Sequence, residues 1–128
     1  MGTFGPYPGV VRDWHDGDTC HVDVDVGFAL TVASHDLDGK PTLSCRIFGI
    51  NAPELATVPG KVALGFALQL CPPGTHVVVV SHGWDKYGGR FDGTLTLPDG
   101  TDFAAQMLAA GQAVVMAAVP VQPVAANA

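Results

Sequence analysis

Alternating apolar and polar residues are clearest at positions 20–26. The apolar positions are Cys20, Val22, Val24 and Val26, and the polar positions between them are His21, Asp23 and Asp25. Because successive side chains of a strand point to opposite faces, this pattern predicts a half-buried strand. Further strands are expected at 10–14, at 42–50, in the valine-rich run 75–82 and at 90–97.

Two other segments carry helical signals. Residues 59–71 have an apolar side chain at every fourth position, namely Val62, Phe66 and Leu70, and are followed by two prolines. A second helix is expected to start after a cap at Thr101 or Asp102 and to end at Ala110, before Gly111. The order of three strands, a helix, two strands and a helix suits a small closed or nearly closed barrel.

Length and composition fit one folded domain. The chain has 128 residues, of which 48% are hydrophobic and 14% charged. We expect the domain to cover residues 1–118, and the tail 119–128, with two prolines among small residues, to be flexible. The bias towards alanine, valine, glycine and aspartate is typical of a GC-rich bacterial or phage genome.

Targeting and metal-binding patterns are weak. No apolar stretch is long enough to cross a bilayer and the first residues lack signal-peptide features, so we expect a cytoplasmic protein without membrane contact. We also expect a monomer. The three cysteines are widely spaced, which argues against a disulfide framework or a zinc site. The five histidines lack metal-binding spacing and are assigned to surface or packing roles.

The net charge of -6 argues against a broad nucleic-acid-binding surface, because lysine and arginine normally supply the phosphate contacts. A small phosphate-sized pocket stays open as an alternative. Only the charges that line such a pocket must be positive, and a bound divalent cation can supply part of the field.

Two polar loops, 16–19 and 51–54, flank neighbouring strands. Since the start of one antiparallel strand and the end of the next lie at the same rim, these loops can meet. Asp18 and Asn51, with a backbone carbonyl and waters, would suit a hard cation such as calcium. An ordinary turn and an ordinary strand end are the alternative. Glu54 is the only glutamate in the chain, and a carboxylate beside a cation can position or deprotonate water.

Arg46 stands between apolar neighbours in its strand, so its guanidinium needs an anionic partner. Either a structural carboxylate or a phosphate would serve. Lys86, Tyr87 and Arg90, in and after a glycine-rich loop, could supply more donors to the same anion. A positive pocket within an acidic protein is the resulting hypothesis.

The segments DGDT at 16–19, CRIFGINAPE at 45–54 and DKYGGR at 85–90 together resemble the signature of the staphylococcal-nuclease-like, or thermonuclease, family. The segment LPDGTDFAAQMLAAGQA at 97–113 is also similar, and the likeness covers about residues 10–115. The resemblance implies an α+β, mainly β fold, a five-stranded OB-type β-barrel with one helix after the third strand and one near the C-terminus. It also implies calcium-dependent hydrolysis of DNA or RNA phosphodiesters.

The resemblance also implies roles for individual residues. Calcium would be held by Asp18, Asn51 and the carbonyl of Ala52, with Asp16 and Thr19 next to them. The reacting phosphate would bind Arg46 and Arg90, and Glu54 would handle the attacking water. A terminal phosphate would be bound by Lys86 and Tyr87. The transition state would then gain its stabilisation from the arginines and the metal.

Three departures bear on activity. Asn51 stands where the family usually has a metal-binding aspartate, an extra glycine precedes Arg90, and the end of the chain lacks the tyrosines that stack on a nucleotide. Removing a negative charge lowers the expected calcium affinity. The alternative functions are a non-catalytic module of the same fold that binds nucleic acid or protein, and a structural or assembly protein.

Overall fold

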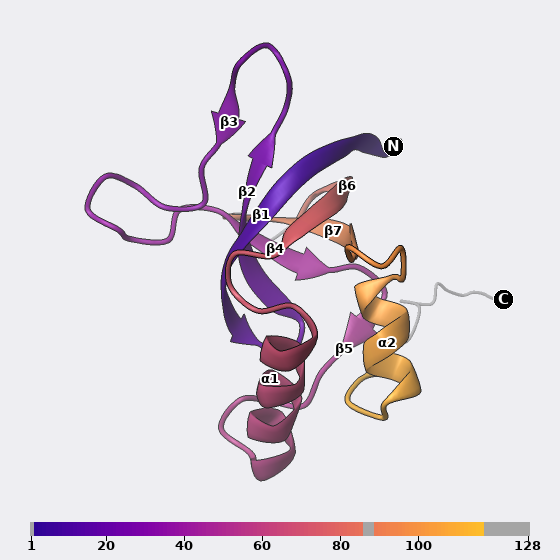
Figure 1. Cartoon of the computed structure of the whole chain (residues 1–128). Coiled ribbons are helices and arrows are strands. Elements are labelled where there is room, and N and C mark those ends of the chain that lie inside the picture. Colours follow the sequence, from indigo (N-terminus) through magenta and orange to yellow (C-terminus); the bar gives the residue numbers. More distant parts are fainter. Residues whose placement is uncertain (1, 86–88, 117–128) are drawn as a thin grey trace, which may run out of the picture.

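A closed barrel of five strands forms the centre of the computed structural model, which describes residues 2–85 and 89–116 (Figure 1). The barrel strands are β1 (Phe4–Asp16), β2 (Thr19–Asp25), β4 (Ser44–Ile47), β6 (His76–Trp84) and β7 (Arg90–Thr96). Their order is β1-β6-β7-β4-β2, and β2 pairs with β1 to close the barrel. Only the β4–β7 contact within this barrel is parallel. With α1 (Val58–Leu70) between β4 and β6, this is an OB-type barrel and an α+β, mainly β fold.

The predicted alternation of residues 20–26 sets the inside and outside of the barrel. Cys20, Val22 and Val24 are buried in the core, whereas His21 and Asp23 lie on the outer face of β2. The same alternation continues in β7, where Phe91 and Leu95 are buried. Because burial of apolar area is the main favourable term in folding, this register is strongly specified.

A tryptophan connects the helices to the barrel. Trp14 of β1 stacks on Phe103 of α2 (Phe103–Ala109), with ring centroids 4.6 Å apart. Its indole N–H donates a 2.8 Å hydrogen bond to the carbonyl of Cys71, directly after α1. The cap of α2 is Asp102, whose carboxylate accepts a hydrogen bond from the N–H of Ala105 at 3.0 Å. The second predicted helix is therefore present.

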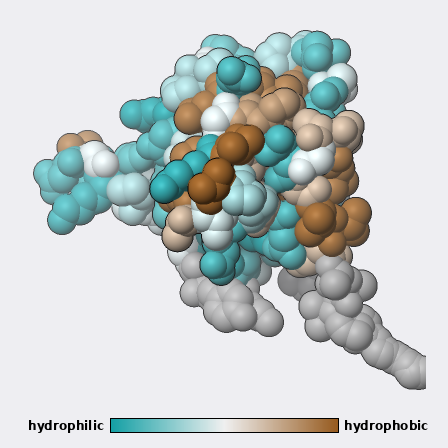
Figure 2. Space-filling model, turned by 90° about the horizontal axis from the view of Figure 1, so that it is seen from below, coloured by the Kyte–Doolittle hydropathy of each residue, from teal (hydrophilic) through white to brown (hydrophobic). Residues whose placement is uncertain are grey.

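The first predicted helix is present as well, but it buries a different face from the one expected. Its buried residues are the small ones Gly60, Ala63 and Ala67. Val62 is 53% exposed, and Phe66 and Leu70 are only partly buried. Small residues let the helix backbone approach the barrel closely, so the larger apolar side chains stay near the surface. The view from the α1 end shows apolar patches interrupted by polar residues (Figure 2).

The third predicted strand is divided in two. β4 ends at Ile47, Gly49 adopts a positive φ of 85°, and β5 (Ile50–Asn51) then pairs with β8 (Val114–Val115) in a separate small sheet. Since only glycine adopts such a φ easily, the turn directs residues 50–51 away from the barrel.

The other departures lie at the ends of β1 and β2. β1 begins earlier than predicted, because its first part pairs with β6. β3 (Thr31–Val32) turns back and pairs antiparallel with the end of β2, so the two form a projecting hairpin, and residues 33–43 project as a loop (Figure 1). The predicted tail 119–128 falls outside the described residues. In the ranges 2–85 and 89–116, no helix has the length and apolar character needed to cross a membrane.

Candidate functional site

The two polar loops predicted to meet do meet at one rim of the barrel. The N–H of Ala52 donates a 2.8 Å hydrogen bond to Oδ2 of Asp18. Asp16 holds the turn, since its Oδ1 accepts the N–H of Asp18 at 3.1 Å. Gly17 sits so close to the second loop that a Cβ atom there would lie 2.9 Å from the Cβ of Ala52. The contact between the loops therefore needs glycine at the turn.

The carboxylate of Asp18 is buried and already hydrogen-bonded on both oxygens. Its side chain is 11% exposed, and Oδ1 accepts the hydroxyl of Thr19 at 3.1 Å. Burial, followed by the neighbouring carboxyl of Asp16, raises the pKa of Asp18, while the N–H of Ala52 and the charge of Arg46 act in the opposite direction. Negative charge at this position is thus only partly compensated by the protein.

Arg46 of β4 finds its partners within the same rim. Nη1 donates to the carbonyls of Ile47 at 3.0 Å and Ile50 at 2.7 Å, and Nη2 donates to Oδ1 of Asn51. The same Nη1 lies 3.7 Å from Oδ2 of Asp18. The side chain is 12% exposed, so this arrangement removes most of the cost of burying the guanidinium.

Side-chain oxygens of Asp16, Asp18 and Asn51 gather at this rim. Calcium takes six to eight oxygen ligands, so this oxygen-only donor set fits calcium, with backbone carbonyls and water filling the remaining positions. One exchange is required, because the amide oxygen of Asn51 now accepts from Arg46. The structure shows the N–H of Ala52 directed at Asp18, while its carbonyl is the group that the family resemblance assigns to the metal.

Glu54 lies exposed on the loop between β5 and α1. Its backbone is anchored, because its carbonyl accepts the N–H of Thr57 at 3.0 Å and the hydroxyl of Thr57 at 2.6 Å. Thr57 is in turn the N-cap of α1. The position of Glu54 is therefore coupled to the start of that helix.

Arg90 lies on the same outer face as Arg46, on the neighbouring strand. In the parallel β4–β7 pair, Ser44 is opposite Arg90 and Arg46 is opposite Asp92. The two arginines are thus offset by one strand and by two residues, a rise of about 6.6 Å along the strands. Lys86 and Tyr87 lie outside the described residues.

Two aspartates, Asp85 and Asp92, lie beside these arginines, and the sequence analysis gave neither of them a role. Nε of Arg90 lies 3.2 Å from Oδ2 of Asp85. Burial, then the charge of Asp85, raises the pKa of Asp92, although Arg46 and Arg90 act in the opposite direction. In the described part of the rim, the expected positive pocket therefore has mixed charge. The alternation of Arg90, Phe91 and Asp92 could have predicted this negative charge, because it places Asp92 on the same face of the strand as Arg90.

Asp92 gives a pH prediction. Its raised pKa means that the folded state binds a proton more readily than the unfolded state, so ionised Asp92 lowers stability as pH rises above about 3.8. We expect Asp92→Asn to raise the free energy of unfolding at neutral pH, with the gain disappearing below pH 3.8 in urea denaturation. Asp99→Asn is the control. It should lower the free energy of unfolding at neutral pH, because hydrogen bonds from Thr101 lower the pKa of Asp99 in the folded state. A gain for Asp92→Asn that is independent of pH would contradict this account.

No protein-family model matched the chain, and a search of curated proteins gave no match either. What the rim does must therefore be inferred from its geometry and from the fold.

Proposed function

We propose that this protein is a calcium-dependent phosphodiesterase that cleaves DNA, RNA or both. The observation that supports this most is the convergence of Asp18, Arg46 and the Asn51-Ala52 segment at one rim of an OB-type barrel. The face formed by the second and third strands of such barrels commonly binds oligonucleotides. These residues also belong to the segments that resemble the thermonuclease family.

In this proposal the residues of the rim have separate roles in metal binding, phosphate binding and proton transfer. Asp18 and Asn51 would hold calcium, whose chemical contribution is to polarise the phosphoryl oxygen. Arg46 binds a non-bridging oxygen of the phosphate, and Arg90 adds a second guanidinium from the neighbouring strand. Glu54 is exposed, so it can accept a proton from an attacking water.

Substrate binding must rearrange one contact. A phosphate that takes the Nη2 donor of Arg46 releases the amide oxygen of Asn51, which Arg46 now engages. The released amide oxygen would then be available to hold calcium. Phosphate and calcium should therefore strengthen each other's binding by the same factor, because such coupling is reciprocal.

A non-catalytic module of the same fold is the second candidate. The observations that favour it are the hydrogen bonds already made by both oxygens of Asp18 and by Arg46, and the aspartates beside the arginines. Such a protein would bind nucleic acid or a protein partner without cutting. The third alternative, a structural or assembly protein, would bind no nucleic acid.

Calcium titration with plasmid DNA and with RNA separates these candidates. We expect the protein to cleave both substrates or one of them when calcium is present, and to stop cleaving when a calcium chelator is added. Binding in a mobility-shift assay without cleavage would instead favour the module, and neither binding nor cleavage would favour the structural alternative.

Thermal unfolding tests calcium binding without using activity. At a calcium concentration about 100 times Kd, binding to the native state adds about 2.7 kcal/mol to the free energy of unfolding. Asp18→Asn should abolish this gain, because it removes the buried carboxylate charge while keeping an acceptor for the N–H of Ala52. Asp38→Asn, in the exposed loop, is the matched control and should keep the gain. An equal gain in both variants would place calcium elsewhere.

A further inference from the structure

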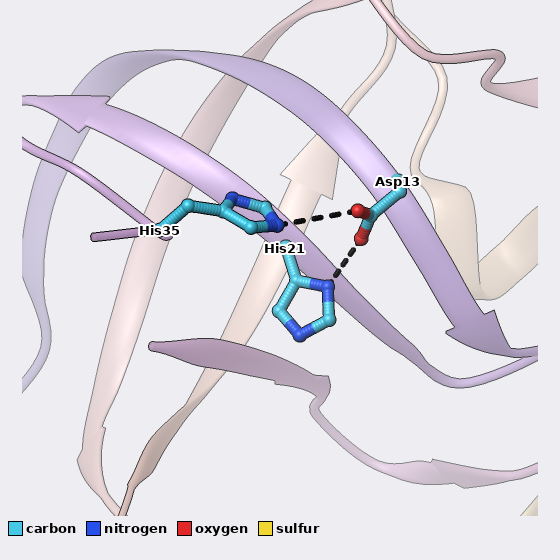
Figure 3. Close-up of side chains that lie close together, drawn as sticks. All are labelled: Asp13, His21 and His35. Carbon is cyan, nitrogen blue, oxygen red and sulfur yellow. Dashed lines mark hydrogen bonds and ion pairs between the residues drawn. The ribbon is translucent and has the colours of Figure 1, made fainter. Parts of the chain in front are cut away.

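A second group of possible metal ligands lies on the outer face of the barrel, at Asp13, His21 and His35 (Figure 3). Asp13 of β1 and His21 of β2 are directly opposite each other in the antiparallel pair. A register shift between Val11 and Asp13 precedes this pair, as a β-bulge does when it redirects a side chain. The loop after β3 brings His35 to the same place, and one potential ligand atom of each residue lies within 4.8 Å of the others.

The carboxylate of Asp13 stands between the two imidazoles. One of its oxygens contacts Nδ1 of His21, and the other lies 3.3 Å from Nε2 of His35. The side chains of both histidines are 12% exposed, whereas that of Asp13 is 48% exposed. The group is thus fixed on the protein side and accessible to solvent at Asp13.

Hydrogen bonding behind His35 determines which of its nitrogens carries the proton. The hydroxyl of Ser34, which is fully buried, donates its single proton to Oδ1 of Asp23 at 2.8 Å. The same hydroxyl lies 2.8 Å from Nδ1 of His35, so at that contact it accepts and Nδ1 is the donor. The N–H of Ser34 and the guanidinium of Arg12 also bind Asp23, each at 2.8 Å, and hold the acceptor in place.

A neutral His35 therefore directs the lone pair of Nε2 at a carboxylate oxygen of Asp13. Two electron-rich atoms 3.3 Å apart repel each other unless a cation lies between them. Two ligands placed about 2.0–2.1 Å from a tetrahedral zinc ion are themselves roughly 3.3 Å apart. A proton on Nε2 would relieve the same repulsion, and His21 already contacts the other oxygen of Asp13, so the metal titrations below separate a bound proton from a bound metal ion.

We propose that Asp13, His21 and His35 form a binding site for a divalent transition-metal ion of the zinc type. Two imidazoles and one carboxylate, with water at the open position, are typical of such ions and not of calcium. Ser34 and Asp23 form the outer hydrogen bonds that orient a metal-binding histidine. The site shares no residue with the proposed calcium site, although Thr19 and His21 lie on the same outer face of β2.

Cobalt(II) and zinc(II) are the probes, added singly to the untagged, metal-free full chain without nucleic acid. We expect calorimetry to show binding of one zinc ion per chain, and cobalt to give visible d–d absorption without a thiolate charge-transfer band. His21→Ala and His35→Ala should lose both signals, whereas His76→Ala, at an exposed histidine of β6, should keep them. Ser34→Ala should weaken zinc binding by roughly 10–100-fold, because the hydroxyl orients the ring.

Circular dichroism keeps these variants interpretable. If His21→Ala or His35→Ala does not fold, His35→Gln and Asp13→Asn replace them in the same titrations. No zinc binding by the wild-type chain, a thiolate band from the cysteines, or unchanged binding after loss of the ligands would overturn the proposal. None of these outcomes depends on cleavage, so the zinc site and the proposed nuclease can fail separately.

Discussion

The Arg46→Ala variant should cleave nucleic acid with calcium roughly 10²–10³-fold more slowly than the wild-type chain, the usual loss when one preorganised donor to a transition-state oxygen is removed. The largely buried guanidinium of Arg46 lies close to Asp18, with Nη1 3.7 Å from Oδ2. Glu54→Gln should lower the rate by a comparable factor, because an amide cannot accept the proton of the attacking water. Rates are measured under single-turnover conditions, so that the chemical step is observed.

Folding must be separated from catalysis in this test. Arg46 also donates to the carbonyls of Ile47 and Ile50, so its loss leaves buried acceptors unpaired and lowers stability. Glu54→Gln does not have this effect, since Glu54 is exposed. Lys61→Ala controls for the loss of one positive charge, because Lys61 is an exposed residue of α1. Full cleavage by folded Arg46→Ala and Glu54→Gln would show that the roles implied by the resemblance are wrong.

Strand alternation and turn chemistry predicted the order of strands and helices and suggested a closed or nearly closed barrel, and the family resemblance added its OB type. Inward and outward positions follow directly from a period of two, and the turns at Asp16-Gly17 and Gly111 end their elements as the residues dictate. The sequence could not predict the pairing of β5 with β8, because residues 50–51 and 114–115 lie far apart along the chain. It also misled on α1, where side-chain hydrophobicity pointed to Val62 while close packing required Gly60 and Ala63.

The sequence predicted which loops form the candidate site, but it did not predict which side chains contact each other there. The resemblance located Asp18, Arg46 and Asn51, and strand geometry brought their loops together. That Arg46 uses Asn51 as its acceptor depends on side-chain rotamers, for which the sequence has no pattern. The histidine group was missed for a related reason, since positions 13, 21 and 35 acquire their proximity from a bulge, a strand pair and a long loop. In both groups of residues, segments that are separated along the chain meet only in the folded structure, so sequence spacing alone does not reveal the contacts.

The largest expected effect on the fold comes from Gly60→Ala. In α1 Gly60 packs so closely on the preceding loop that a Cβ atom would overlap the carbonyl oxygen of Glu54. This neighbour is backbone and cannot move aside as a flexible side chain could. The loop or the helix must shift, which should lower the free energy of unfolding by about 1–3 kcal/mol, the usual cost of overpacking. Urea denaturation with circular dichroism measures the loss.

The same substitution should also impair the proposed cleavage, because the displaced carbonyl belongs to the residue that would handle water. A shift of about 1 Å at a reacting group can reduce the rate by roughly 10²-fold. Gly65→Ala is the matched control in the same helix, where a Cβ atom meets nothing within 4 Å. It should stabilise the helix by about 0.5–1 kcal/mol and leave the rate unchanged. If both variants were equally stable and equally active, the packing of α1 would not determine the position of Glu54.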